Sequence, residues 1–230
     1  MNPESHNIKV QKTARFFQVG KADKDTKVLY IALHGYGQQA ERLIRKFDEM
    51  GEDSCILAPE GLSRFYWNEK TGQTGASWMT KDDREAEIED YCNYLQAVYD
   101  SFINKVAKNT KIVLLGFSQG GATAMRWLLL NRPERIDSVQ LWGCDIPPEL
   151  DYKSAAEYLK NKKLYWIYGD TDPYLGADRV QQLENRFRQF LLSPEIIVFN
   201  GGHEVDRALL MRLHGKIKDE LISSQDERAL

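Results

Sequence analysis

One stretch, residues 111–121, constrains the fold of this chain more than any other. Its first half is an uninterrupted apolar run, residues 112–115, which is typical of a strand buried on both faces. The run leads into the pentapeptide Gly-Phe-Ser-Gln-Gly, centred on Ser118, and a helical pattern follows over residues 122–130. A sharp turn from strand to helix needs glycines two residues before and after the central serine, because a Cβ there would collide with neighbouring backbone. The pattern therefore predicts a tight strand–turn–helix unit with Ser118 at its apex.

A serine on such a turn projects its hydroxyl above the sheet. The next amide N–H, that of Gln119, then lies at a helix N-terminus, where it can stabilise a negative charge that develops on a bound carbonyl oxygen. This arrangement, a nucleophile elbow, predicts that Ser118 is a nucleophile. The alternative is a structural turn whose glycines serve packing and whose serine caps the helix.

Strands and helices alternate along the chain, with no break in composition and no internal repeat. This alternation predicts a single α/β domain over residues 1–230, with a mostly parallel central sheet and helices on both faces. We expect residues 1–15 to form a loose lead-in or an edge strand, and residues 223–230 to form a polar tail. An aromatic-rich stretch, residues 62–80, has an irregular pattern and is predicted to be a long surface loop.

The composition narrows the class of protein. The net charge of −3 shows no basic excess, so we do not expect nucleic acid as a partner. The apolar runs are too short to span a membrane, and the first residues lack the pattern of a signal peptide, so we expect no stable membrane anchoring. The three cysteines have no metal-like spacing and indicate reduced thiols in a cytoplasmic protein without a bound metal. The assembly is left open, with a homodimer as one alternative.

A serine hydroxyl becomes a good nucleophile only when a base takes its proton and an acid orients that base. In chain order we expect the serine, then the acid, then a histidine. His203 follows a predicted strand and the glycine pair 201–202, so it can reach back over the turn and is the predicted base. The other three histidines have different contexts: His6 lies in the lead-in, His34 precedes the serine, and His214 falls within a predicted helix.

Two aspartates, Asp170 and Asp172, are available as the acid on the loop after the predicted strand 164–168. Pro173 favours an extended conformation for Asp172, which suits a carboxylate that reaches outward. Asp170 follows a glycine directly and is better placed to stabilise the turn itself. We therefore favour Asp172, and both remain compatible with an ordinary polar turn.

A second donor to a developing oxyanion is expected from the loop that follows the first central strand. The loop reads His-Gly-Tyr-Gly over residues 34–37, and the backbone N–H of Tyr36 is the candidate. His34, at the strand end, is expected to be a structural hydrogen-bonding residue. The Tyr36 ring, with Trp67 and Trp78, is a candidate for an apolar wall of a substrate pocket; for the two tryptophans, simple burial in the core is the alternative.

Four segments together resemble a known family: residues 33–37, 116–121, 169–173 and 202–204, read in order. They are similar to the phospholipase/carboxylesterase family of α/β-hydrolases, which includes the acyl-protein thioesterases, and the similarity runs over about residues 28–221. The resemblance implies an α/β-hydrolase fold without a large cap domain and a reaction without a cofactor. It also implies Ser118, Asp172 and His203 as a catalytic triad, and the Tyr36 and Gln119 amides as the oxyanion hole.

The chain departs from the family pattern outside the triad, at Gln38, at Tyr168 and over residues 142–145 and 76–79. Because the proposed triad residues are unchanged, we expect these differences to affect which substrate is accepted and not the type of reaction. The expected activity is hydrolysis of small-molecule carboxylic esters or thioesters through an acyl-enzyme. Alternatives are the same chemistry on a lysophospholipid or on an acetyl ester of the xylan type, and a non-catalytic hydrolase fold that serves as a binding module.

Overall fold

The strand β6 (Lys111–Phe117) is the middle strand of the molecule, and its side chains from Ile112 onward are buried. In the computed structural model, which describes residues 3–226, β6 is the fourth strand of a seven-stranded sheet with the order β1-β3-β2-β6-β7-β8-β9. Its neighbours β2 (Val28–Leu33) and β7 (Ser138–Trp142) run parallel to it. All residues of β2 and β7 are buried, so both faces of the sheet centre are covered.

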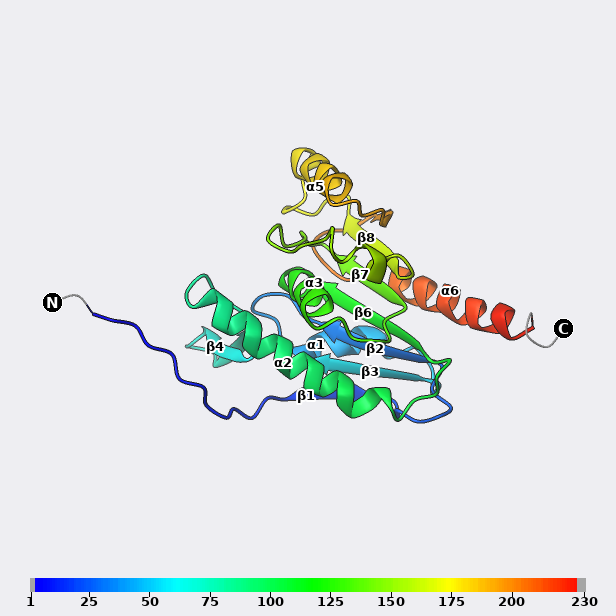
Figure 1. Cartoon of the computed structure of the whole chain (residues 1–230), viewed down its shortest axis with the longest axis horizontal. Coiled ribbons are helices and arrows are strands. Elements are labelled where there is room, and N and C mark those ends of the chain that lie inside the picture. Colours follow the sequence, from blue (N-terminus) through cyan, green and yellow to red (C-terminus); the bar gives the residue numbers. More distant parts are fainter. Residues whose placement is uncertain (1–2, 227–230) are drawn as a thin grey trace.

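The outer strands extend this sheet on both sides (Figure 1). β3 (Ser54–Pro59) pairs parallel with β2, while β8 (Lys163–Gly169) and β9 (Glu195–Phe199) continue the parallel order beyond β7. β1 (Phe16–Val19) pairs antiparallel with β3 and is an edge strand. Residues 3–15 precede it without regular structure, as expected of a lead-in. The prediction of a mostly parallel sheet is confirmed.

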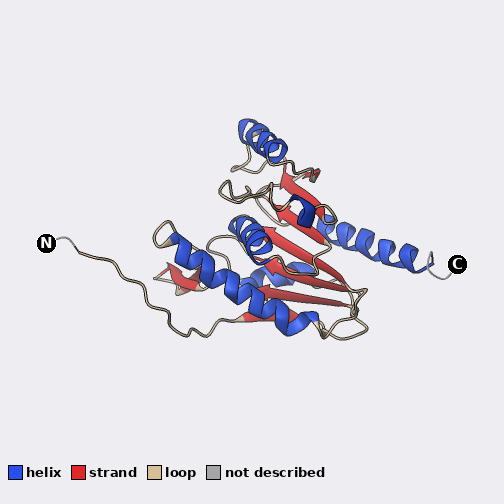
Figure 2. Ribbon diagram, in the orientation of Figure 1, coloured by secondary structure: helices blue, strands red, loops and turns tan. Residues whose placement is uncertain are grey.

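Helices cover both faces of the sheet (Figure 2), and alternate residues of β2 separate the two cores. Leu29, Ile31 and Leu33 pack in one core, and Val28, Tyr30 and Ala32 in the other. The first core is closed by α2 (Arg84–Ile103), α3 (Gln119–Asn131), α4 (Ala156–Leu159) and α5 (Ala177–Gln189). The second is closed by α1 (Ala40–Ile44), the short 3₁₀ helix η1 (Arg45–Phe47) and α6 (Arg207–Asp226).

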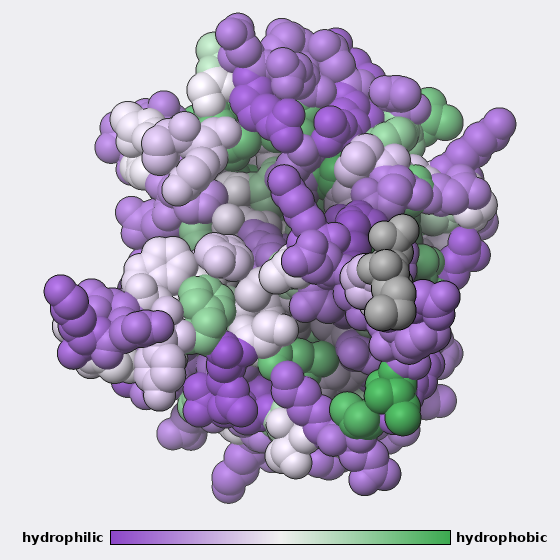
Figure 3. Space-filling view, turned by 90° about the vertical axis from the view of Figure 1, so that its left-hand side faces the viewer, coloured by the Kyte–Doolittle hydropathy of each residue, from purple (hydrophilic) through white to green (hydrophobic). Residues whose placement is uncertain are grey.

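The prediction of an irregular loop over residues 62–80 is wrong, because this segment contains a β-hairpin. β4 (Ser63–Asn68) and β5 (Gln73–Ser77) form a separate two-stranded antiparallel sheet. Gly72 lies in the turn with φ +69°, a conformation that favours glycine. The hairpin lies at the left of Figure 1 and belongs to the side that faces the viewer in Figure 3, where the surface is mainly hydrophilic and hydrophobic residues form small separate patches.

The C-terminal helix is longer than expected. α6 continues to Asp226, although a polar tail was predicted from residue 223, and residues 227–230 of that predicted tail lie outside the described residues. Within residues 3–226, we find no helix with the length and apolar character needed to cross a bilayer.

Two histidines are built into the cores as neutral rings. His34 accepts a hydrogen bond at Nε2 from the Gly61 N–H (2.9 Å) and donates from Nδ1 to the Gly35 carbonyl (2.7 Å), so one neutral tautomer satisfies both partners. His214 in α6 donates from Nε2 to the Met50 carbonyl (3.1 Å). Burial lowers the pKa of both imidazoles. His34 therefore has the structural role predicted for it.

We expect the protein to lose stability as the pH falls below about 6.5, the pKa of an unfolded histidine. The folded state holds His34 and His214 with lowered pKa values, so protons bind preferentially to the unfolded chain. The free energy of unfolding should fall by at most about 1.4 kcal/mol per pH unit for each histidine. Urea unfolding measured at neutral pH and near pH 5 checks this.

The matched variants are His214→Gln, whose amide can still donate to Met50, and His6→Gln, which removes an imidazole with an 80% exposed side chain. His214→Gln should flatten the pH dependence, and His6→Gln should leave it unchanged. A decline as steep in His214→Gln as in the wild type would contradict this explanation.

Candidate active site

Ser118 lies at the junction of β6 and α3 with a strained backbone, φ 53° and ψ −120°. The glycines around it are required by close contact. A Cβ on Gly116 would lie 2.5 Å from the Gly120 carbonyl oxygen, and a Cβ on Gly120 would lie 2.3 Å from the Leu33 carbonyl oxygen of β2. The Ser118 N–H also donates to the Trp142 carbonyl of β7 (2.9 Å). The predicted tight turn is therefore present, and both neighbouring strands hold it.

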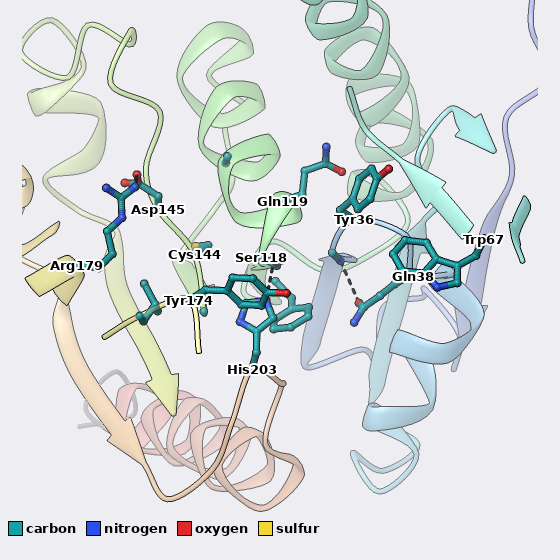
Figure 4. A pocket seen from close by; sticks show the side chains of 15 residues that line it. Tyr36, Gln38, Trp67, Ser118, Gln119, Cys144, Asp145, Tyr174, Arg179 and His203 are labelled. Atoms are coloured by element: carbon teal, nitrogen blue, oxygen red, sulfur yellow. Dashed lines mark hydrogen bonds and ion pairs between the residues drawn. The ribbon is translucent and has the colours of Figure 1, made fainter. Parts of the chain in front are cut away.

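His203 joins Ser118 to Asp172. Its Nε2 lies 3.0 Å from Ser118 Oγ, and its Nδ1 lies 2.7 Å from Asp172 Oδ2. A carboxylate can only accept, so Nδ1 carries the proton and the Nε2 lone pair faces the serine hydroxyl. The three predicted residues, far apart in the chain, thus form one hydrogen-bonded line, drawn in part in Figure 4.

The Asp172 carboxylate is held in place on both oxygens. Its side chain is only 1% exposed, and Oδ1 accepts from the Tyr174 N–H (2.9 Å) while Oδ2 accepts from His203. Asp170 has a structural role that differs from the local turn bond considered for it: its Oδ1 accepts from the Gly201 N–H (3.0 Å) and ties the loop after β8 to the loop after β9. Of the two aspartates, the structure brings Asp172 to the histidine.

Three residues that the sequence analysis did not single out shape the surroundings of His203. The rings of Phe117 and Tyr174 lie 4.8 and 4.7 Å from the imidazole, centroid to centroid. Gly143 has φ +54°, and a Cβ there would come within 3.1 Å of His203 Nδ1. A glycine directly after a predicted strand was the available signal for this close approach, whereas nothing in the sequence pattern marked the two rings.

The residues of the two predicted oxyanion donors lie next to Ser118 in the chain or in contact with its neighbours. Gln119 is the first residue of α3, so its N–H has no acceptor within the helix. Tyr36 follows Gly35, which packs so closely that a Cβ there would lie 3.1 Å from Ser118 Cβ. Gln38 fixes this loop by accepting the Gly35 N–H at Oε1 (3.1 Å) and donating its own N–H to the Gly35 carbonyl (3.2 Å).

The hairpin also supports this loop. The Gly37 N–H donates to the Ala76 carbonyl of β5 (2.9 Å), and the Ala76 N–H donates to the Gln38 carbonyl (3.1 Å). A Cβ on Gly75 would lie 2.5 Å from the Gly37 carbonyl oxygen, so the two backbones lie in close contact. The β4–β5 hairpin therefore determines where Tyr36 lies.

The two tryptophans proposed for the pocket wall have different positions. Trp67 is 54% exposed, lies 6.0 Å from the Tyr36 ring and lines the cavity beside Ser118. Trp78 is 1% exposed, and its indole N–H donates to the His34 carbonyl (2.9 Å). Trp78 is therefore buried in the core, as the alternative prediction had it, and its indole bonds to the end of β2. Trp67 instead lines the cavity.

The cavity above Ser118 has a volume of about 530 Å³ (Figure 4). Its walls come from the loops at the carboxyl ends of β2, β6, β7, β8 and β9 and from the hairpin, as expected for a parallel sheet. The lining residues are Gly35, Tyr36, Gln38, Trp67, Phe117, Ser118, Gln119, Ala122, Gly143, Cys144, Asp145, Tyr174, Leu175, Arg179 and His203. In the part of the chain that the structure describes, we find no group of three or more metal-ligating side chains.

Solved structures with the same fold cover nearly the whole chain at low identity. Zea mays acyl-protein thioesterase 2 superposes with a TM-score of 0.69 at 15% identity, covering 91% of this chain and 100% of that one. Esterase PE8 gives 0.64 at 17% identity (90% and 99% covered), and the Bacillus cereus carboxylesterase gives 0.62 at 14% (90% and 94%). A search of curated protein sequences finds no match.

The family comparison agrees with this fold. The model of the phospholipase/carboxylesterase family matches residues 14–220, which is most of the chain. The predicted α/β-hydrolase fold is confirmed, and the described residues form no cap domain over the sheet. The chain belongs to the phospholipase/carboxylesterase family of α/β-hydrolases.

Proposed function

We propose that the protein is a serine hydrolase that cleaves carboxylic esters or thioesters through an acyl-enzyme. The observation that carries this proposal is the hydrogen-bonded line from Ser118 through His203 to Asp172, with contacts of 3.0 and 2.7 Å. A serine whose only role was to cap α3 would need no imidazole at its hydroxyl, and its side chain makes no cap hydrogen bond.

In the proposed reaction, Ser118 Oγ attacks the substrate carbonyl carbon while His203 Nε2 takes its proton. The Asp172 carboxylate stabilises the imidazolium that forms. The Tyr36 and Gln119 amides donate to the tetrahedral oxyanion, and each such donor typically contributes about 3 kcal/mol to lowering the barrier. His203 then gives its proton to the leaving alcohol or thiol. A water molecule, deprotonated by His203, next attacks the acyl-enzyme carbonyl, and the carboxylic acid and free Ser118 are released.

The cavity supports a small-molecule substrate. Its volume of about 530 Å³ falls within the range of about 300–1,000 Å³ that is usual for such sites. The exposed rings of Tyr36 and Trp67 offer an apolar wall for an acyl chain.

We also propose a cytoplasmic location, supported by the free, buried thiols of Cys55, Cys92 and Cys144.

Ser118→Ala should abolish covalent labelling by a fluorophosphonate probe, because the probe reacts only with an activated serine. It should also lower kcat on 4-nitrophenyl butyrate by roughly 10⁴-fold or more. The control is Ser101→Ala, since Ser101 lies on the exposed side of α2 and bonds only to the Ala97 carbonyl. Absence of labelling in the wild-type protein would favour the alternative of a non-catalytic binding module.

Asp172→Asn should lower kcat by roughly 10⁴-fold, because an amide cannot hold His203 in the Nδ1-protonated tautomer. Asp170→Asn is the matched change two residues away, and it touches only the bond to the Gly201 N–H. It should cost stability with a much smaller loss of kcat. Steady-state rates and thermal unfolding of both variants test this, and a larger loss of kcat in Asp170→Asn would assign the acid to Asp170 instead.

A further inference from the structure

The wall of the cavity opposite the aromatic residues carries charge that the proposed reaction does not use. Asp145, on the loop after β7, and Arg179, near the start of α5, both line the cavity. Figure 4 shows them on one side of Ser118, with Tyr36 and Trp67 on the other. Among the described residues that line the cavity, Asp145 and Arg179 are the only aspartate, glutamate, lysine or arginine side chains.

Two arginines share the single Asp145 carboxylate. Arg179 Nη2 lies 2.6 Å from Asp145 Oδ2, and Arg186 Nη1 lies 2.7 Å from each carboxylate oxygen. A guanidinium is always protonated in proteins. Two positive charges and one negative charge therefore leave one positive charge uncompensated within this cluster, on the wall of the cavity.

Arg186 anchors the loop after β7 on α5. Its Nη1 contacts both oxygens of Asp145 and also the Ile146 carbonyl (3.4 Å), and its side chain is 25% exposed. Arg179 adds one bond to Asp145 and one to the Gln182 side chain (3.2 Å), and it remains 42% exposed. Arg186 therefore makes most of the contacts that anchor this loop, and the more exposed Arg179 adds one.

Arg179 also keeps donors free. A guanidinium has five N–H groups in a planar fork that matches the oxygens of a carboxylate or a phosphate. Two of its nitrogens are engaged, Nη1 with Gln182 and Nη2 with Asp145, and neither bond uses the second proton on that nitrogen. An anionic group in the cavity could then be bound without breaking the ion pair that positions Arg179.

We propose that Arg179 makes the enzyme selective for esters or thioesters that carry a carboxylate or phosphate group. This inference rests on the proposed hydrolase function and names its substrate class. The anionic group binds at the Arg179 wall and the uncharged part of the substrate packs on Tyr36 and Trp67, so the scissile carbonyl is oriented over Ser118. A charge-assisted hydrogen bond of this kind favours the anionic substrate by about tenfold or more.

Two matched pairs of substrates test the proposal and distinguish the position of the anion. Mono-4-nitrophenyl glutarate against 4-nitrophenyl pentanoate places a carboxylate on the acyl side. 1-Butyrylglycerol 3-phosphate against 1-butyrylglycerol places a phosphate on the leaving-group side. The measured quantity is the ratio of kcat/KM for the anionic and neutral member of each pair, at low and at high ionic strength, because salt weakens an interaction between charges.

The variants are Arg179→Gln, which removes the charge, Arg179→Lys, which keeps it, and Arg188→Gln as control. Arg188 is on the same helix, pairs with Glu184 at 3.5 Å, and does not line the cavity. We expect wild type and Arg188→Gln to prefer the anionic member of one pair about tenfold, with the preference largely lost in Arg179→Gln and partly kept in Arg179→Lys.

The outcomes separate this inference from the proposed function. Hydrolysis of the neutral esters with no preference for either anionic member would overturn the selectivity and leave the hydrolase intact. An equal loss on both members of a pair in Arg179→Gln would show that Arg179 acts structurally, and would also overturn it. If none of the four substrates is hydrolysed, both the selectivity and the proposed hydrolase function are overturned.

Discussion

The close contact of three backbone segments around Ser118 is the constraint on which the site depends. β6 enters the turn between β2 and β7, and glycines at 116 and 120 let carbonyl oxygens approach to distances that no Cβ would allow. The strained φ and ψ of Ser118 cost about 1–3 kcal/mol. That strain persists because the strands on both sides are buried along their whole length and cannot relax without opening the core.

The other two members of the proposed triad are positioned by contacts between two loops. The loop after β8 and the loop after β9 bind each other through Asp170 and Gly201, and through the Thr171 N–H and the Gly201 carbonyl (3.0 Å). A Cβ on Gly169 would lie 2.1 Å from that same carbonyl oxygen. Because the loops form one unit, the distance from Asp172 to His203 is fixed independently of the elbow, and the sheet then sets the distance to Ser118.

Local signals were sufficient where a residue's role follows from its immediate neighbours. The elbow, the order of strands and helices, and the candidates Ser118, Asp172 and His203 all follow from short motifs and from apolar runs. The hairpin carried no such signal, because Phe65, Tyr66 and Trp67 are three consecutive aromatic residues without apolar–polar alternation. Only in the structure do the Phe65 and Trp67 rings pack with Tyr36 and with each other while Tyr66 is 65% exposed.

Other features depend on contacts between distant segments, which periodicity does not encode. Trp67 and Trp78 lie in the same aromatic stretch, but only the packing of β5 against the loop after β2 decides that one is exposed and the other buried. The pairing of Asp145 with Arg179 and Arg186 joins segments 34 and 41 residues apart, and neither segment shows a motif for it.

The site thus separates chemistry from recognition. The groups proposed for chemistry lie at strand ends or on the paired loops after β8 and β9. Neighbouring backbone lies so close there that a larger side chain would collide with it. The side chains proposed for recognition are exposed: Trp67 on the hairpin, Arg179 in α5 and the Tyr36 ring on the loop after β2 are each about half exposed. Because exposed side chains can change without disturbing the core, a fold of this kind can keep one reaction while its cavity walls differ in charge. The aromatic and cationic walls of this cavity give it a polarity that a purely apolar acyl pocket would lack.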